Sequence, residues 1–287
     1  MPLLVHGYRF TLNTIHFVSM PFSFDNILIT VDTSGNAEIA ISEALKFYDG
    51  QGSSMNLVYV KKKPFLYSFF GNKIYEDSKA SQVLQKLKQS ILLYNDEVKV
   101  GTSIVDNAHS QKCIAEKAVT FKSDMIILGN QTKFSTFSFL ENINPSSLSA
   151  ITKIPVLTAT ANAFANETKI IVLPVEDIDF EKKLEMTFVL SKKFKLSIHL
   201  VTQVEKEYSS MNSLASSFIE AFDWLKKNLH CSVQYSFLKG SNKAKALVDY
   251  CIHVNADLLI QTAVNDTSSK DIGDFFPRHS KTQVLTI

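Results

Sequence analysis

The stretch DMIILGNQT at residues 124–132 is the first place where the residue types suggest chemistry. Asp124 is followed by an apolar run that ends at Gly129, so a strand there would lead into a glycine turn. Glycine lets backbone N–H groups come close to phosphate oxygens, because it has no side chain in the way. A second stretch, DLLIQTAVN from Asp257, repeats the pattern with Thr262 in place of the glycine. The first stretch is therefore a candidate phosphate-binding turn.

The cysteines and histidines do not form a metal-binding pattern. The chain has three cysteines, Cys113, Cys231 and Cys251, and no two of them form a C-x-x-C pair. Any disulfide scheme therefore leaves one thiol unpaired. His230 beside Cys231, and His253 close to Cys251, lack the second pair of ligands that a structural zinc site needs. We therefore expect no metal, and reduced thiols of the kind found in the cytoplasm.

The familiar catalytic motifs are also missing. The sequence contains no G-x-S-x-G, H-E-x-x-H, G-x-x-x-x-G-K or G-x-G-x-x-G run. Because no nucleophile and base occur in a recognisable context, we expect no catalytic residues and no enzymatic activity.

Charge and hydropathy exclude two classes of partner. The net charge is +2, from 30 basic and 28 acidic residues, and only Arg9 and Arg278 are arginine. Such a chain has no long-range electrostatic field that would attract nucleic acid or anionic lipid.

Residues 1–23 are apolar, but polar residues interrupt them, and they lack the layout of a signal peptide. We expect a flexible extension, or residues that precede a start at Met20, and no membrane segment.

The rest of the chain is an internal repeat. Four pairs of stretches recur in the same order: DNILITVD and KIIVLPVE, SMNLVYV and SIHLVTQ, SDMIILG and ADLLIQT, and PVLTAT and QVLTI. The offset falls from 144 residues in the first pair to 128 in the last, so the second copy is the same unit with deletions. The expected units are residues 24–161 and a shortened unit at 168–287.

Each unit combines buried strands with amphipathic helices. Continuous apolar runs, rather than alternating ones, predict strands covered on both faces, as in a parallel sheet. Helical spacing between these runs predicts three helices, at Ala37, Ile41, Ala44, Leu45 and Tyr48, at Val83, Leu84, Leu87, Ile91 and Tyr94, and at Ile114, Ala118 and Phe121. Asn144 followed by Pro145 predicts the start of a fourth, ending near Lys153. The predicted fold class is α/β, with two tandem, doubly wound, parallel five-stranded sheets.

In order and spacing, ILITVDTSGNAEIAISEALKF, LVYV, DMIILGNQ and IPVLT resemble the universal stress protein family over residues 24–161. The resemblance continues in register over residues 168–287. It implies Rossmann-like units of the universal stress protein type in their tandem form. It also implies an intramolecular pseudo-dimer, in which the units pair through their last strands, Val156–Thr160 and Val284–Ile287. Pairing would cover two apolar strand edges that otherwise invite aggregation.

Many members of that family bind ATP through a G-x2-G-x9-G-[S/T] motif after the fourth strand. Laid on this chain, the motif keeps Gly129, whereas Thr132, Asn142 and Ile143 occupy the other three positions. Pro145 also removes a nearby N–H donor. The resemblance thus implies a degenerate ATP-binding motif in the first unit. The loop of the second unit is shorter and lacks the first glycine, so it departs further from the motif.

The resemblance implies a nucleotide cleft in the first unit, with the candidate residues Thr30, Asp32, Val60, Gly129, Thr132 and Asn142. Asp32, matched loosely by Glu176 in the second unit, would lie near an adenine, and the backbone of Val60 would face the base. Asp32 could equally cap the following helix with Thr33 and Ser34. We expect no tightly bound cofactor, and a weakly bound adenine nucleotide is the one candidate.

Two aromatic stretches would flank this cleft. KFSTFSFLEN places Phe134, Phe137, Phe139 and Leu140 in the loop that would hold phosphates, where they either fold over the empty cleft or contact another surface. The stretch Lys61–Tyr75, KKKPFLYSFFGNKIY, either packs against a neighbouring unit or forms a lid over the first cleft. Binding of single-stranded nucleic acid by its lysines and aromatic rings is the less favoured interpretation.

The favoured function is a cytoplasmic, non-enzymatic stress-response module that acts by protein interaction or by sensing a small ligand. The alternatives are an adenine-nucleotide-binding universal stress protein that uses the first cleft, and a weak ATP hydrolase. The sequence does not identify the protein partner, and a further homodimer is compatible with this interpretation.

Deleting residues 1–20 should change the free energy of unfolding by less than about 1 kcal/mol, the usual range for changes away from packed features. Thermal unfolding of the shortened and intact chains measures this difference. A much larger loss would show that the segment is folded onto one of the units.

Overall fold

The structure is a computed structural model of the 287-residue chain. It describes residues 22–31, 36–48, 52–61, 73–105, 110–130, 143–160, 168–175, 180–203, 211–240, 242–263 and 281–287. Our expectations for most of the N-terminal extension, for the two aromatic stretches and for the link between the units fall outside the described residues.

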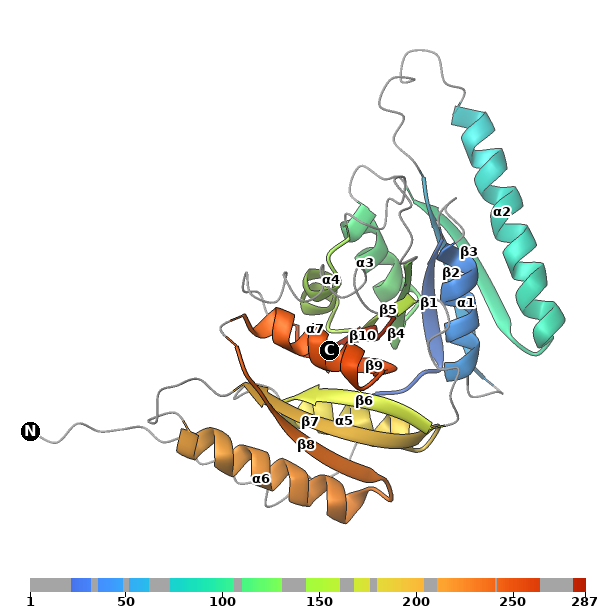
Figure 1. Ribbon diagram of the computed structural model, residues 1–287. Helices are drawn as coiled ribbons and strands as arrows, with labels where there is room; N and C mark the ends of the chain where they lie inside the picture. The colour runs from blue at the N-terminus through green and yellow to red at the C-terminus, as the bar shows by residue number, and fades with distance from the viewer. Residues whose placement is uncertain are drawn as a thin grey trace, which may run out of the picture.

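Strands and helices alternate through the first half of the chain (Figure 1). In chain order the elements are β1 (Asn26–Val31), α1 (Asn36–Phe47), β2 (Ser54–Val60), α2 (Lys73–Tyr94), β3 (Lys99–Val105), α3 (Ser110–Thr120), β4 (Met125–Asn130), α4 (Pro145–Thr152) and β5 (Val156–Thr160). The helices predicted from apolar spacing are all present. α2 begins at Lys73, well before Val83, the first residue used to predict it.

The second half repeats this order. Its described elements are β6 (Thr168–Pro174), α5 (Phe180–Ser191), β7 (Lys195–Gln203), α6 (Met211–Asn228), β8 (Ser232–Leu238), α7 (Lys243–His253), β9 (Leu258–Gln261) and β10 (Gln283–Thr286). The residues between β9 and β10, where the repeat predicts a fourth helix, lie outside the described part.

The ten strands in the described part of the chain form one sheet, in the order β3-β2-β1-β4-β5-β10-β9-β6-β7-β8. Neighbouring strands are parallel within each group of five, and the antiparallel pair β5·β10 joins the groups. The predicted fold class, with two parallel five-stranded sheets forming a pseudo-dimer, is confirmed. The predicted pairing of the last strands is present as well.

The β5·β10 register is self-complementary. Leu157 lies opposite Leu285, Val284 opposite Thr158, and Thr286 opposite Val156. In the repeat, the residues of β10 match those of β5 at an offset of 128, so Leu285 is the counterpart of Leu157. Thr158 thus faces the counterpart of Val156, and Val156 faces the counterpart of Thr158, as in an isologous dimer with its twofold axis at the two leucines.

One face of the sheet carries a core that both units share. Alternate residues of β1 and β6, such as Ile29 and Leu173, belong to the same buried cluster, which α1, α2, α5 and α6 complete. Leu157 and Leu285 lie in it too. On the opposite face each unit keeps a separate cluster, packed under α3 and α4 in the first unit and under α7 in the second. Since a fully buried leucine or isoleucine contributes about 1.5–3 kcal/mol, the shared cluster binds the units strongly.

Aromatic contacts join α1 to the end of α5 across the junction. The rings of Phe47 and Phe194 meet edge to face, with 5.6 Å between centroids, and Phe47 also packs on Phe24 at 5.1 Å. Lys193 Nζ donates to the backbone carbonyl of Phe47. Phe22, at the end of the expected extension, packs partly buried against the same core. The unit boundaries 24–161 and 168–287 stay a prediction.

None of the helices in the described part of the chain is long and apolar enough to cross a lipid bilayer.

Truncating the chain after Asn166 should expose the edge of β5, because its partner strand β10 is then missing. The fragment should form a homodimer or an aggregate in sedimentation experiments, since a self-complementary apolar edge invites pairing with another copy. Adding a fragment of residues 168–287 should convert it into a 1:1 complex. A well-behaved monomer that ignores the second fragment would contradict this role of the junction.

Candidate functional site

The strand order of the first unit reverses between β1 and β4, which is where open α/β sheets bind ligands. Pairing between these strands stops at Ile29 and Ile127. β1 nevertheless continues along β2 to Val31, and β4 continues along β5 to Asn130. The two central strands therefore separate at their carboxyl ends, and this gap in the hydrogen-bond ladder is the candidate site.

The structure brings three of the six predicted cleft residues to this end of the sheet. Thr30 is fully buried, and its hydroxyl donates to the carbonyl of Ile127 at 3.3 Å, across the gap between the strands. Val60, the last residue of β2, is buried under α3. Gly129 is buried in β4 and lies beside Ala159 of β5. Asp32, Thr132 and Asn142 lie outside the described residues.

Side chains of the protein itself occupy the N-terminus of α4, where the family motif would hold phosphate. Ile143 stands at the hydroxyl position of the motif and is 4% exposed, packed in the core under α3 and α4. Ser147 N donates to Oδ1 of the capping residue Asn144 at 2.8 Å. Asn144 N in turn donates to Gln111 Oε1 at 3.3 Å, and Pro145 has no N–H. The sequence predicted the cap, but it did not predict the contact with Gln111.

The acidic residues that open the two glycine-turn stretches hold the other end of the strands. Asp124 Oδ2 accepts from Asn26 N at 3.0 Å, while Asp124 N donates to Asn26 O at 2.8 Å. Asp257 and Ile170 make the same pair of contacts in the second unit, at 2.8 and 2.9 Å. Asp124 and Asp257 therefore fix the starts of β1 and β6, far from the carboxyl ends where a ligand would bind.

The equivalent end of the second unit has different chemistry. Pro174 takes the place of Thr30, and its carbonyl accepts from Lys183 Nζ at 2.9 Å. Lys183, on α5, is fully buried. Thr262 replaces Gly129, and its buried hydroxyl has no hydrogen-bond partner among the described residues. The two ends of the pseudo-dimer are thus not interchangeable sites.

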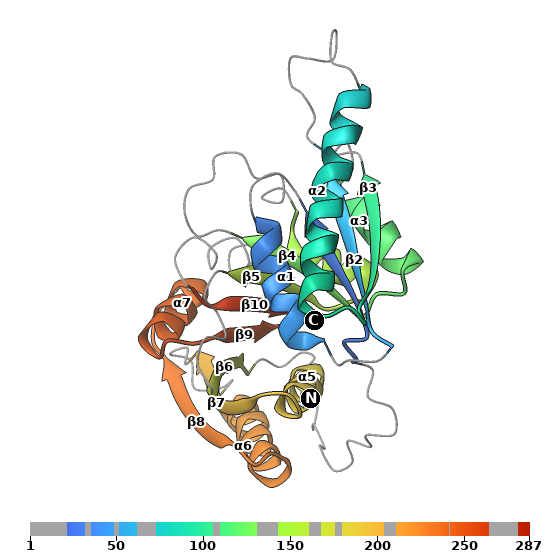
Figure 2. The ribbon, with the colours of Figure 1, turned by 90° about the vertical axis from the view of Figure 1, so that its right-hand side faces the viewer.

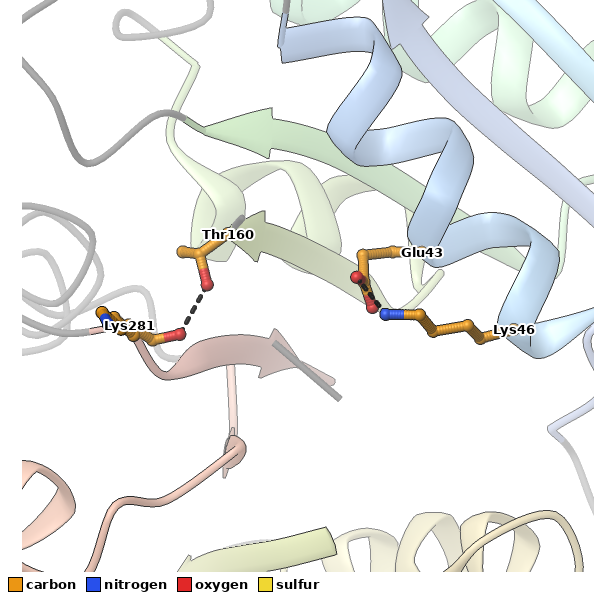
Figure 3. A network of polar contacts seen from close by, with 4 residues as sticks. All are labelled: Glu43, Lys46, Thr160 and Lys281. Atoms are coloured by element: carbon orange, nitrogen blue, oxygen red, sulfur yellow. Dashed lines mark hydrogen bonds and ion pairs between the residues drawn. The ribbon is translucent and has the colours of Figure 1, made fainter. Parts of the chain in front are cut away.

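Polar side chains lie at the junction of the two units (Figure 3). Glu43 and Lys46 of α1 form an ion pair at 2.6 Å, and Thr160 Oγ1 donates to the carbonyl of Lys281 at 2.5 Å. Lys169 of β6 is buried, and burial lowers its pKa; Lys46 acts in the same direction, and Asp257 and Glu43 oppose it. The Glu43 side chain is buried and that of Lys46 is partly buried, so the cost of desolvation offsets much of their attraction, and the shared apolar core is the main link between the units.

A second buried polar group lies under α7. His199 Nδ1 of β7 is 3.0 Å from the hydroxyl of Tyr250, and that hydroxyl donates to Ser236 Oγ of β8 at 3.1 Å. Burial lowers the pKa of His199. In the first unit the matching strand position holds Asn56. The network joins β7, β8 and α7, and it was not predicted from the sequence.

The described residues contain no group of three or more histidine, cysteine or acidic side chains that could hold a metal ion. Burial raises the pKa of both Cys231 and Cys251, and Cys251 is fully buried. Neither thiol therefore has the lowered pKa that marks a reactive cysteine.

Replacing His199 with asparagine should flatten the pH dependence of stability. The pKa of His199 is lowered by folding from an ordinary value of 6.5, so the unfolded chain takes up this proton first as the pH falls. The stability linked to neutral His199 is therefore present above pH 6.5 and lost below it. Urea unfolding between about pH 5 and pH 8 measures this slope. An unchanged slope in His199→Asn would contradict the assignment.

Solved structures similar to the chain share its fold at low sequence identity. A universal stress protein from Archaeoglobus fulgidus DSM 4304 has a TM-score of 0.66 at 12% identity, covering 93% of this chain and 97% of that one. A functionally unknown protein from Pseudomonas aeruginosa PAO1 reaches 0.61 at 15% identity, covering 93% of each chain. The cytoplasmic domain of a prokaryotic cation chloride cotransporter reaches 0.50 at 14% identity, covering 91% of this chain and 94% of that one. No protein-family model and no curated protein sequence matches the chain. The chain thus has the fold of the universal stress proteins, with two such units in tandem.

Proposed function

We propose that the protein is a non-enzymatic, cytoplasmic stress-response module that acts through protein contacts or by sensing a small ligand. The observation that supports this proposal is that side chains of the protein itself occupy the N-terminus of α4. In this fold a phosphate chain would need the N–H groups at the start of that helix, where the helix dipole also favours an anion. Here Asn144 N and Ser147 N donate to side chains, and Pro145 has no N–H.

The side chain of Ile143 also disfavours a phosphate at this place, for a steric reason. A hydroxyl at its position could face a phosphate oxygen, but the isoleucine side chain is buried in the core under α3 and α4. Moving it out to make room would expose apolar surface, at a cost of about 1.5–3 kcal/mol. The arrangement therefore disfavours a triphosphate, and with it the weak ATP hydrolase considered from the sequence.

An adenine nucleotide with fewer phosphates is the second candidate ligand. The observation in its favour is the separation of β1 and β4 after Ile29 and Ile127 in the first unit. The buried Gly129 lies near the end of β4, beside this gap, and the buried Val60 ends β2, on the other side of β1. A base needs apolar walls and backbone groups rather than a phosphate cradle, so such a ligand is compatible with the first unit. The second unit, with Pro174 and Thr262 at the equivalent positions, would serve the fold and protein contacts.

ATP should bind the intact protein with a Kd weaker than millimolar, because the start of α4 offers too few free N–H groups. Isothermal titration with ATP, ADP and AMP makes the comparison, and AMP should bind no more weakly than ATP. Saturable ATP binding in the micromolar range, about 4 kcal/mol tighter than millimolar, would overturn the proposal.

Restoring the motif tests whether the loop is the cause. The triple variant Thr132→Gly, Asn142→Gly, Ile143→Ser should bind ATP more tightly than the wild type. The matched control is Ile143→Ser alone, which loses the same core packing and keeps the two larger residues. If the triple variant folds by circular dichroism and gains no affinity, the first unit is closed to ATP by more than these three residues.

A further inference from the structure

β8 ends the ten-stranded sheet, and it pairs with β7 along one edge (Figures 1 and 2). In both views it lies at the outer margin of the second unit with α6 beside it. Tyr235 and Phe237 are 58% and 54% exposed. Val233, on the same side of the strand, is buried in the shared core. Two large aromatic side chains are therefore exposed at the outer edge of the sheet, on the same side of β8 as the buried Val233.

These rings are held in place by others beneath them. Phe218 of α6 lies 5.6 Å from Phe237 and 5.8 Å from Tyr235, measured between ring centroids. Phe222 lies 6.0 Å from Tyr235, and Tyr235 lies 6.0 Å from Phe237. Aromatic pairs at such distances are mutually stabilising, so the exposed rings form a fixed surface.

The first unit does not need aromatic residues at the same place. At the offset of 133 that relates β3 to β8, Thr102 matches Tyr235 and Ile104 matches Phe237. β3 also begins with the exposed Lys99, a charge of the kind that protects edge strands, whereas β8 begins with Ser232. Since β3 forms the equivalent edge without these features, the fold itself does not explain the aromatic rings of β8.

The charge pattern of β8 favours a second copy of the same strand. Its seven residues, SVQYSFL, contain no charged side chain. In antiparallel pairing about a twofold axis at Tyr235, Val233 would lie opposite Phe237, and Gln234 opposite Ser236. The first charged residue beyond the strand, Lys239, would lie opposite Cys231, so no like charges meet. Like charges directly opposite one another would have disfavoured self-pairing.

We propose that β8 is a homodimer interface, which pairs antiparallel with β8 of a second copy and extends the sheet across both molecules. No strand in the described part of the chain pairs with the outer edge of β8, so its main-chain groups would supply the register, and Tyr235 and Phe237 of both copies would bury apolar surface. This surface is separate from β5 and β10, which are used within the chain. The proposal does not depend on whether a nucleotide binds.

Sedimentation equilibrium of the intact protein tests the proposal. The wild type should show a concentration-dependent monomer–dimer equilibrium. Tyr235→Lys places two like charges opposite each other at the twofold axis and should weaken the dimer at least tenfold. The matched control, Thr102→Lys on β3, should leave the equilibrium unchanged, and thermal unfolding verifies that both variants are folded. A wild type that stays monomeric at every concentration, or a Tyr235→Lys variant that dimerises normally, would overturn the proposal.

Disulfide trapping tests the register independently. Opposite residues in an antiparallel pair have Cβ atoms about 4.5–5.5 Å apart, so a cysteine on the axis can bond to its own copy after a small adjustment. In a Cys113→Ser, Cys231→Ser background, Tyr235→Cys should form an intermolecular disulfide under mild oxidation. Ser232→Cys, exposed at the end of the strand, should not, because its copy lies far along the partner strand.

Two trapping results would reject this interface: equal cross-linking of both cysteine variants, or none at all. A monomer that binds phosphatidylcholine vesicles through Tyr235 and Phe237 would assign the surface to a membrane instead, and would also overturn the proposal.

Discussion

The antiparallel pairing of β5 with β10 is the contact on which the rest of the structure depends. It turns two five-stranded parallel sheets into one sheet of ten strands and covers both of the apolar edges at the centre. Leu157 and Leu285 lie opposite each other at the centre of this pairing. Both side chains belong to one buried cluster with residues from the helices of both units. The pairing therefore sets the positions of both strand ends where a ligand could bind, and of both outer edges.

The pairing is symmetric, but the residues around it are not. The register of β5 and β10 is that of an isologous dimer, whereas Glu43 and Lys46 of the first unit have Thr187 and Leu190 as counterparts in the second. The same divergence separates Thr30 from Pro174 and Gly129 from Thr262 at the strand ends, and Thr102 from Tyr235 at the outer edges. After the units were joined in one chain, each position needed to satisfy one environment rather than two. This asymmetry supports different roles for the units.

Local and repeated patterns carried the parts of the fold that could be predicted from the sequence. Apolar runs located the strands, Asn144 and Pro145 located the start of α4, and the family resemblance implied the pairing of the last strands. Contacts between distant residues could not be predicted in this way. The bond from Asn144 N to Gln111 and the bonds from Asp124 and Asp257 to the strand starts depend on how the elements meet in space. For the candidate site, the resemblance named Thr30, Val60 and Gly129, but only the structure placed them at the same end of the sheet.

Through β5 and β10 the two units should form one cooperative structure. Native-state hydrogen exchange of the intact protein tests this cooperativity, because amide protection reports the free energy of local opening. Amides of β5 and β10 should exchange as slowly as those of β1 and β6, since opening the junction would require breaking the shared core. If the amides of β10 exchange orders of magnitude faster while β1 and β6 stay protected, the units are independent domains that merely touch, and the junction does not couple them.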